Sequence, residues 1–133
     1  MRFVGGILDC PFCQLVNSRT WISNQHGIAF RDGFPISPGH TLIFPKEHVA
    51  CFFDLSSDIQ HSLWELVSVV RTRLVEEFHP DGFNVGMNDG QTAGQTVLHA
   101  HIHVIPRYKG DVVDPRGGVR WIIPSKAAYW NTD

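Results

Sequence analysis

Apolar side chains recur every three to four positions across residues 57–78, and this spacing places them along one face of an α-helix. Ser57 with Gln60 three residues later has the pattern of a capping box, and Pro80 followed by Gly82 ends the helical pattern. The apolar positions are Ile59, Leu63, Leu66, Val67, Val70, Leu74, Val75 and Phe78. The pattern predicts one long helix whose apolar face covers a flat layer.

Short apolar segments on both sides of this helix predict strands at residues 26–31, 40–45, 83–88 and 99–105. The loop DGFPISPG joins the first two as a long hairpin, and the loop DGQTAGQT joins the other two. Residues 119–123 predict a last short strand, and residues 10–16 a short helical turn. An antiparallel sheet with one long helix across it is an α+β architecture.

Length and composition restrict the class of protein. The 133 residues contain no repeat or linker, so we expect one domain over residues 1–133. A formal charge of -2 without a basic stripe argues against a nucleic-acid polymer as a partner. No apolar stretch reaches the roughly 18–20 residues of a membrane span, so we expect no membrane association and a cytoplasmic location.

Histidine is the residue type that points to chemistry, because three of the eight histidines stand at alternate positions, His99, His101 and His103. In a strand these side chains share one face while the intervening apolar residues face the core. A metal site is one alternative, but the outer two α-carbons would lie about 13 Å apart, so at most two of the three histidines could share one ion. A neutral imidazole can attack phosphorus directly. Three solvated histidines on an exposed face are the alternative.

The loop before this row of histidines is rich in glycine and small polar residues. Gly90 and Gly94 expose backbone N–H groups, and Gln95 and Thr96 add an amide and a hydroxyl. Such groups suit phosphate oxygens. The loop alone is equally compatible with a flexible connection that binds no anion, but its position beside three imidazoles favours a phosphate site.

The segment HAHIHVI, residues 99–105, resembles the signature of the histidine-triad family of nucleotide hydrolases and transferases. The motifs NDG, GQTV, PGHTL and PKEH resemble the family's flanking motifs in order and spacing, so that the similarity covers roughly residues 10–107. The resemblance implies an antiparallel five-stranded sheet with one covering helix in each subunit. It also implies a homodimer in which the two sheets join into one.

The resemblance further implies residue roles. The middle histidine, His101, would be the nucleophile that attacks the α-phosphorus of a purine nucleotide, and the nucleotidyl group would then pass to water. His103 and His40 would orient this nucleophile and carry positive charge at the phosphate. The implied nucleotide contacts are Asn88, Gln95, Thr96 and His103 at the phosphate, and Asp32 at the ribose hydroxyls. An ordinary turn residue is the alternative for Asp32.

The implied activity is hydrolysis of dinucleoside polyphosphates or nucleoside phosphoramidates with release of a nucleoside monophosphate. Magnesium would accompany a polyphosphate substrate, and no residue selects the leaving group. Two other functions stay open. A nucleotidyl transferase would share the covalent intermediate, although the short chain argues against it. A low-turnover nucleotide- or zinc-binding adaptor is disfavoured by the complete triad.

Cys10 and Cys13 form a Cys-x-x-Cys motif, which by itself is compatible with redox chemistry, zinc binding or chance. The chain resembles a zinc-containing microbial branch of the histidine-triad family. This resemblance implies one structural zinc ion per subunit, bound by Cys10, Cys13, His48 and His99, a closed set of four ligands. Two reduced thiols in a small buried turn are the alternative.

The C-terminal tail is enriched in arginine, glycine and aromatic residues. It is similar, more loosely, to the extended C-terminal segment of one microbial branch of the same family. Arg116 and Arg120 have two interpretations. They clamp distal phosphates or the leaving group, since guanidinium suits phosphate geometry, or they are solvated charges of a surface loop and a final strand.

Overall fold

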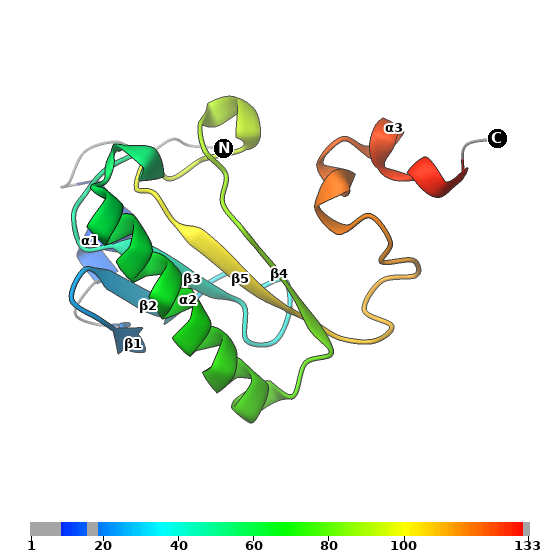
Figure 1. Ribbon diagram of the computed structural model, residues 1–133, viewed down its shortest axis with the longest axis horizontal. Helices are drawn as coiled ribbons and strands as arrows, with labels where there is room; N and C mark the ends of the chain where they lie inside the picture. The colour runs from blue at the N-terminus through cyan, green and yellow to red at the C-terminus, as the bar shows by residue number, and fades with distance from the viewer. Residues whose placement is uncertain (1–8, 16–18, 132–133) are drawn as a thin grey trace.

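The structure is a computed structural model, in which residues 9–15 and 19–131 are described (Figure 1). Its centre is one five-stranded antiparallel sheet in the order β1-β2-β3-β5-β4, with the long helix α2 across one face. The principal elements are α1 Pro11–Leu15, β1 Ile22–Ser23, β2 Gly27–Arg31, β3 Thr41–Pro45, α2 Ser57–Phe78, β4 Gly82–Gly86 and β5 Ile102–Arg107. The predicted α+β class with a five-stranded sheet and one covering helix is confirmed.

The strand register places β5 in the interior of the sheet. Strands β2 and β3 form the predicted hairpin, with Ala29 opposite Ile43. On the other side of β3, Leu42 lies opposite His103 of β5. The outer neighbour of β5 is β4, where Gly86 lies opposite His103. His103 therefore projects from a strand that is held on both sides.

Helix α2 buries its apolar stripe against this sheet. Its buried residues are Leu63, Leu66, Val67, Val70 and Leu74. They pack against Ala29, Ile43, Ile102 and Val104 of the strands. Burying a leucine or valine side chain contributes about 1.5–3 kcal/mol, so this contact supplies much of the driving force for folding.

The ends of α2 differ in detail from the sequence prediction. The N-cap is Ser56 and not Ser57, because the Ser56 hydroxyl accepts the Ile59 N–H at 3.3 Å. The Gln60 side chain donates to the carbonyl of Leu55 at 2.9 Å. At the other end, His79 adopts the left-handed conformation with φ of 52° and caps the helix before Pro80.

The opposite face of the sheet carries a second, smaller apolar cluster. It contains Ile28, Phe30, Leu42 and Phe44 of β2 and β3, covered by Phe12 of α1. The predicted helical turn over residues 10–16 is thus the helix α1, and residue 16 lies outside the described residues. His99 packs edge-on against Phe44, with ring centroids 5.1 Å apart. Because Ile102 and Val104 pack on the α2 side, the alternation of faces along β5 puts the histidines on the other side of the sheet.

One strand prediction was wrong in part and another was wrong. Strand β5 begins at Ile102 and not at residue 99, because the Ala100 N–H bonds the Val49 carbonyl at 2.7 Å, outside any strand. Residues 119–123 form no strand, since Gly118–Ile122 is a 3-10 helix. Gly117 has φ of 93°, and its carbonyl accepts the Arg120 N–H at 2.9 Å, which starts this turn. The fifth strand is the two-residue β1.

The C-terminal segment, residues 111–131, lies beyond strand β4 (Figure 1). Its elements are the 3-10 helices Gly118–Ile122 and Tyr129–Asn131 and the helix α3 Pro124–Ala127. Arg116 lies over the Trp130 ring at 4.6 Å and pairs with Asp114 at 2.9 Å. Arg120 donates to the Lys126 carbonyl at 2.6 Å. Both arginines therefore hold this segment together, which favours the surface-loop interpretation over a phosphate clamp.

None of the described helices is long and apolar enough to cross a membrane.

Candidate functional site

The three alternate histidines lie on one side of the sheet but separate into two groups. The rings of His101 and His103 are neighbours, with centroids 5.2 Å apart. Phe12 of α1 meets the His101 ring edge-on at 5.0 Å. His99 is fully buried and turns toward Cys10, just before α1, and Cys13 of α1. The strand period thus explains the shared face, and the packing of α1 divides the row.

The tautomer of His101 is fixed by the backbone. Its Nδ1 lies 2.8 Å from the carbonyl oxygen of His99. Because a carbonyl only accepts, Nδ1 of His101 carries the proton and Nε2 keeps a lone pair. Burial lowers the pKa of His101, against the opposing effects of this hydrogen bond and the Asp32 charge, and so favours the neutral ring. A neutral imidazole with a free Nε2 is a nucleophile or a general base.

His40 and His103 form a directed pair. The backbone N–H of Ile36 donates to Nδ1 of His40 at 3.2 Å, so the neutral His40 ring carries its proton on Nε2. This Nε2 lies 2.9 Å from Nδ1 of His103, which therefore accepts. Burial, with His101 and His40 nearby, lowers the pKa of His103 to about 4. Near neutral pH His103 then presents an Nε2–H donor.

Asp32 completes a hydrogen-bonded cluster beside this pair. Its Oδ2 lies 3.4 Å from Nε2 of His40, and its Oδ1 accepts the Phe34 N–H at 2.9 Å. Asp32, His40 and His103 are close enough to hold a metal ion. However, the Ile36 N–H occupies the only lone pair of a neutral His40 ring. A chain of hydrogen bonds therefore fits these atoms better than a metal site.

The glycine loop between β4 and β5 is shaped by Gln95. This side chain is buried, accepts the Gly90 N–H at 2.9 Å and donates to the Ala50 carbonyl at 2.8 Å. Gly90 itself has φ of 93°, a conformation that favours glycine. Asn88 is exposed and Thr96 is half-buried. Of the three predicted phosphate contacts in this region, Gln95 is thus occupied in holding the loop, while Asn88 and Thr96 keep access to solvent.

Four sulfur and nitrogen ligands converge on the other side of His101. Sγ of Cys10 lies 3.4 Å from Nδ1 of His99, and Sγ of Cys13 lies 3.2 Å from Nδ1 of His48. The two Nδ1 atoms are 3.2 Å apart. A tetrahedral zinc ion with bonds of about 2.0–2.3 Å places its ligand atoms about 3.3–3.8 Å apart. The observed spacings match this closely.

The protonation of the cluster also suits a cation. Nε2 of His99 lies 2.7 Å from the Pro45 carbonyl and must donate, so its Nδ1 lone pair faces the sulfur atoms. Burial lowers the pKa of His99 to about 4, which keeps the ring neutral. Burial and the neighbouring Cys10 raise the pKa of the Cys13 thiol to about 11. A bound cation would replace thiol protons here, and the residues fit a closed, structural zinc site.

Several contributors to the site gave no signal in the sequence. The carbonyls of His99 and Pro45 and the amide of Ile36 set the tautomers of the three histidines they bind. These are backbone groups, which any residue type can supply. The sequence marks Phe12 only as an apolar residue, and its edge-on contact with His101 depends on how α1 packs.

A five-stranded antiparallel sheet that carries hydrogen-bonded histidines and a glycine loop on the face opposite its helix defines the histidine-triad class of α+β proteins. The chain belongs to this HIT family, whose HIT domain matches residues 16–110. An uncharacterised HIT-like protein of Saccharolobus solfataricus is 36% identical over 106 residues, which are 77% of this chain and 76% of that one.

Two further likenesses concern activity and metal. A bis(5'-adenosyl)-triphosphatase of Dictyostelium discoideum is 42% identical over 77 residues, 58% of this chain and 52% of that protein. The crystal structure of a zinc-bound histidine-triad protein from Mycobacterium smegmatis matches with a TM-score of 0.73 and 31% identity, over 82% of each chain. These likenesses agree with the fold, with phosphate chemistry at the cluster of His40, His101 and His103, and with metal binding at the cluster of cysteines, His48 and His99.

Proposed function

We propose that this protein is a nucleotide hydrolase that forms a nucleotidyl-histidine intermediate at His101 and releases a nucleoside monophosphate. One observation carries the proposal. The hydrogen bond from Nδ1 of His101 to the His99 carbonyl leaves the Nε2 lone pair of His101 available, and the ring of His103 is a neighbour with its centroid 5.2 Å away. The triphosphatase relative supports a phosphoanhydride substrate, and a nucleoside phosphoramidate suits the same chemistry.

The proposed reaction has two steps. In the first, Nε2 of His101 attacks the α-phosphorus, and a P–N bond forms as the bond to the leaving group breaks. A phosphate leaving group departs with the electron pair, whereas the amine of a phosphoramidate also takes a proton. In the second step, water attacks the same phosphorus and releases one proton, while the P–N bond breaks and His101 is regenerated; with a phosphoramidate, this proton balances the one that the amine took. The Nε2–H of His103 donates to a non-bridging oxygen, where negative charge develops.

The neighbouring residues have proposed binding roles. Asn88 and Thr96 contact the phosphate, and Gln95 holds the loop that positions them. Asp32 binds the ribose hydroxyls of a purine nucleotide with the carboxylate that also faces His40. His40 orients His103 through the 2.9 Å hydrogen bond. Magnesium would accompany a polyphosphate substrate and neutralise part of its charge.

Cys10, Cys13, His48 and His99 would hold one structural zinc ion per subunit, as expected for the zinc-containing microbial branch. Such an ion supplies a cross-link with no open coordination position. His48 follows β3, and the Ala100 N–H bonds the carbonyl of the next residue, Val49. The ligands thus join α1, the end of β3 and the segment that leads into β5.

A homodimer with a continuous sheet is the proposed assembly. Strand β4 has β5 on one side only, contains no proline and is five residues long. The other edge strand, β1, has two residues and offers little to pair with. An open edge of this kind is a template for pairing with another chain. The C-terminal segment lies beyond the same edge. The HIT match ends at residue 110, but we propose that residues 1–133 form one domain.

The test is a substrate panel. Purified protein is incubated with adenosine phosphoramidate, diadenosine triphosphate and diadenosine tetraphosphate, and AMP is quantified by chromatography. We expect AMP from at least one of them at a rate that scales with enzyme concentration. AMP transfer to an acceptor in place of hydrolysis would favour the transferase. Tight nucleotide binding without turnover of any member would favour the adaptor.

A further inference from the structure

The loop between β2 and β3, residues 32–40, carries two residues of the proposed site and has little packing of its own. Its side chains Phe34 and Ile36 are 90% and 75% exposed. The loop nevertheless supplies the Ile36 N–H that fixes the tautomer of His40. This hydrogen bond joins residues four apart, so its geometry depends on the shape of residues 36–40. Backbone hydrogen bonds hold part of that shape, since the Asp32 N–H donates to the His40 carbonyl at 2.9 Å and the His40 N–H donates to the Ser37 carbonyl at 3.1 Å.

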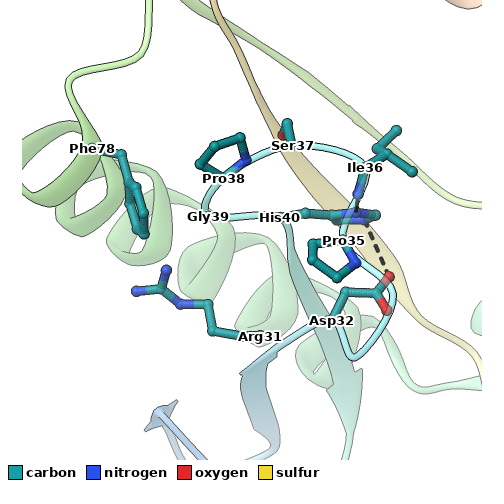
Figure 2. Close-up of a pocket in the computed structure, with 9 residues that line it drawn as sticks. All are labelled: Arg31, Asp32, Pro35, Ile36, Ser37, Pro38, Gly39, His40 and Phe78. Atoms are coloured by element: carbon teal, nitrogen blue, oxygen red, sulfur yellow. Dashed lines mark hydrogen bonds and ion pairs between the residues drawn. The ribbon is translucent and has the colours of Figure 1, made fainter.

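A cavity of about 510 Å³ lies behind this loop, between the loop and the end of α2. Figure 2 shows Pro35 and Pro38 on one side of it and Arg31 and Phe78 on the other. Gly39, in contrast to the residues before it, packs closely against α2, because a Cβ atom there would lie 3.0 Å from the Phe78 ring. Within the described structure, the stretch before Gly39 thus faces open space where packing would otherwise support it.

Two hydroxyl groups fasten this stretch to the end of β5. The Ser37 hydroxyl donates to the Pro106 carbonyl at 2.7 Å. The Tyr108 hydroxyl donates to the Pro38 carbonyl at 2.6 Å. Residues 106 and 108 follow His103 on the same stretch of chain. The two bonds therefore tie the loop that holds His40 to the strand that holds its partner.

We infer that Ser37 and Tyr108 are positioning residues for the reaction proposed above. They hold the loop so that the Ile36 amide stays on Nδ1 of His40 and the His40 proton stays on Nε2, directed at His103. Neither residue needs to touch the substrate. Without these two bonds the loop can move into the cavity, and the Ile36 amide then loses its acceptor. The His40 proton is free to occupy either nitrogen in that state.

The test uses Ser37→Ala, Tyr108→Phe and the double variant, each of which removes only hydroxyl groups. We expect kcat to fall about five-fold in each single variant and more than about ten-fold in the double variant, with KM within about two-fold. Ser68→Ala, on the exposed side of α2, and Tyr129→Phe, in the C-terminal segment, are matched controls. If the double variant does not fold, the single variants carry the comparison.

A readout independent of turnover separates this inference from the proposed function. Two-bond proton–nitrogen NMR spectra report the tautomer of His40, and amide exchange reports the Ile36 N–H. We expect a single Nε2–H tautomer in the natural protein, and mixed tautomers with faster Ile36 exchange in the variants. An unchanged tautomer and exchange rate in both single variants would overturn the positioning role. A protein inactive on every substrate that still shows these changes would overturn the hydrolase proposal alone.

Discussion

Replacing His101 by alanine is expected to lower kcat by about ten-thousand-fold or more while AMP still binds. The expectation follows from covalent chemistry, because the proposed reaction takes its attacking lone pair from this ring, and loss of a nucleophile typically costs this much. His101→Asn sharpens the test, since its amide can keep a hydrogen bond to the His99 carbonyl but has no nucleophilic nitrogen. Both variants are compared by steady-state AMP release and by AMP titration.

The matched control is His61→Ala, which removes an exposed histidine of α2. It should turn over at the natural rate. His103→Asn should lose less than His101→Asn, because it removes a donor to the developing charge and leaves the nucleophile in place. Normal turnover by His101→Asn would show that the reaction does not pass through this ring.

Removing a cysteine of the sulfur–nitrogen cluster is expected to cause the largest loss of stability. Cys10→Ala should lower zinc content from about one ion per chain to near zero, and the midpoint of thermal unfolding by about 10 °C or more. The reason is that the proposed ion would tie α1 to the segment that leads into β5, and the unfolded chain would lack this cross-link. Metal analysis and calorimetry on protein purified without chelator measure both effects.

Cys51→Ala is the control, because this half-buried thiol belongs to no described ligand cluster. Zinc uptake by the natural protein should also release protons, since the Cys13 thiol has its pKa raised to about 11 by burial and by Cys10. Zinc affinity should therefore fall as the pH is lowered. Protein that contains no zinc, or that loses no stability in Cys10→Ala, would leave the four converging ligands without a metal.

The parts of the fold that the sequence predicted are those with a strong local period. The apolar stripe of α2 repeats over six turns, and the alternation around His101 and His103 is unambiguous. Local sequence patterns did not predict the secondary structure of segments whose conformation depends on tertiary contacts. Gly117 and the aromatic–arginine contacts of the C-terminal segment turn an apolar stretch into a 3-10 helix. A two-residue strand such as β1 has too few positions to show any period.

For the site, residue identity could be predicted and atomic roles could not. The spacing of His99, His101 and His103 pointed to imidazole chemistry on one strand face, and the resemblance to a family grouped His99 with the cysteines. Which nitrogen of each ring carries the proton depends on backbone groups at 36, 45 and 99. The same holds for Gln95, whose amide has the chemistry of a phosphate contact but makes its hydrogen bonds to backbone groups at Gly90 and Ala50.

The central claim is a covalent bond between phosphorus and Nε2 of His101, and rapid quenching tests it most directly. The enzyme is mixed with the fastest substrate of the panel, quenched in alkali within one turnover and digested, and the peptides are analysed by mass spectrometry. Alkali is chosen because a phosphorus–nitrogen bond to histidine is labile in acid. We predict an adenylyl group on the peptide that contains His101, which appears and decays at rates compatible with kcat and is absent from His101→Asn. Turnover at the full rate without any adduct on that peptide would contradict the account.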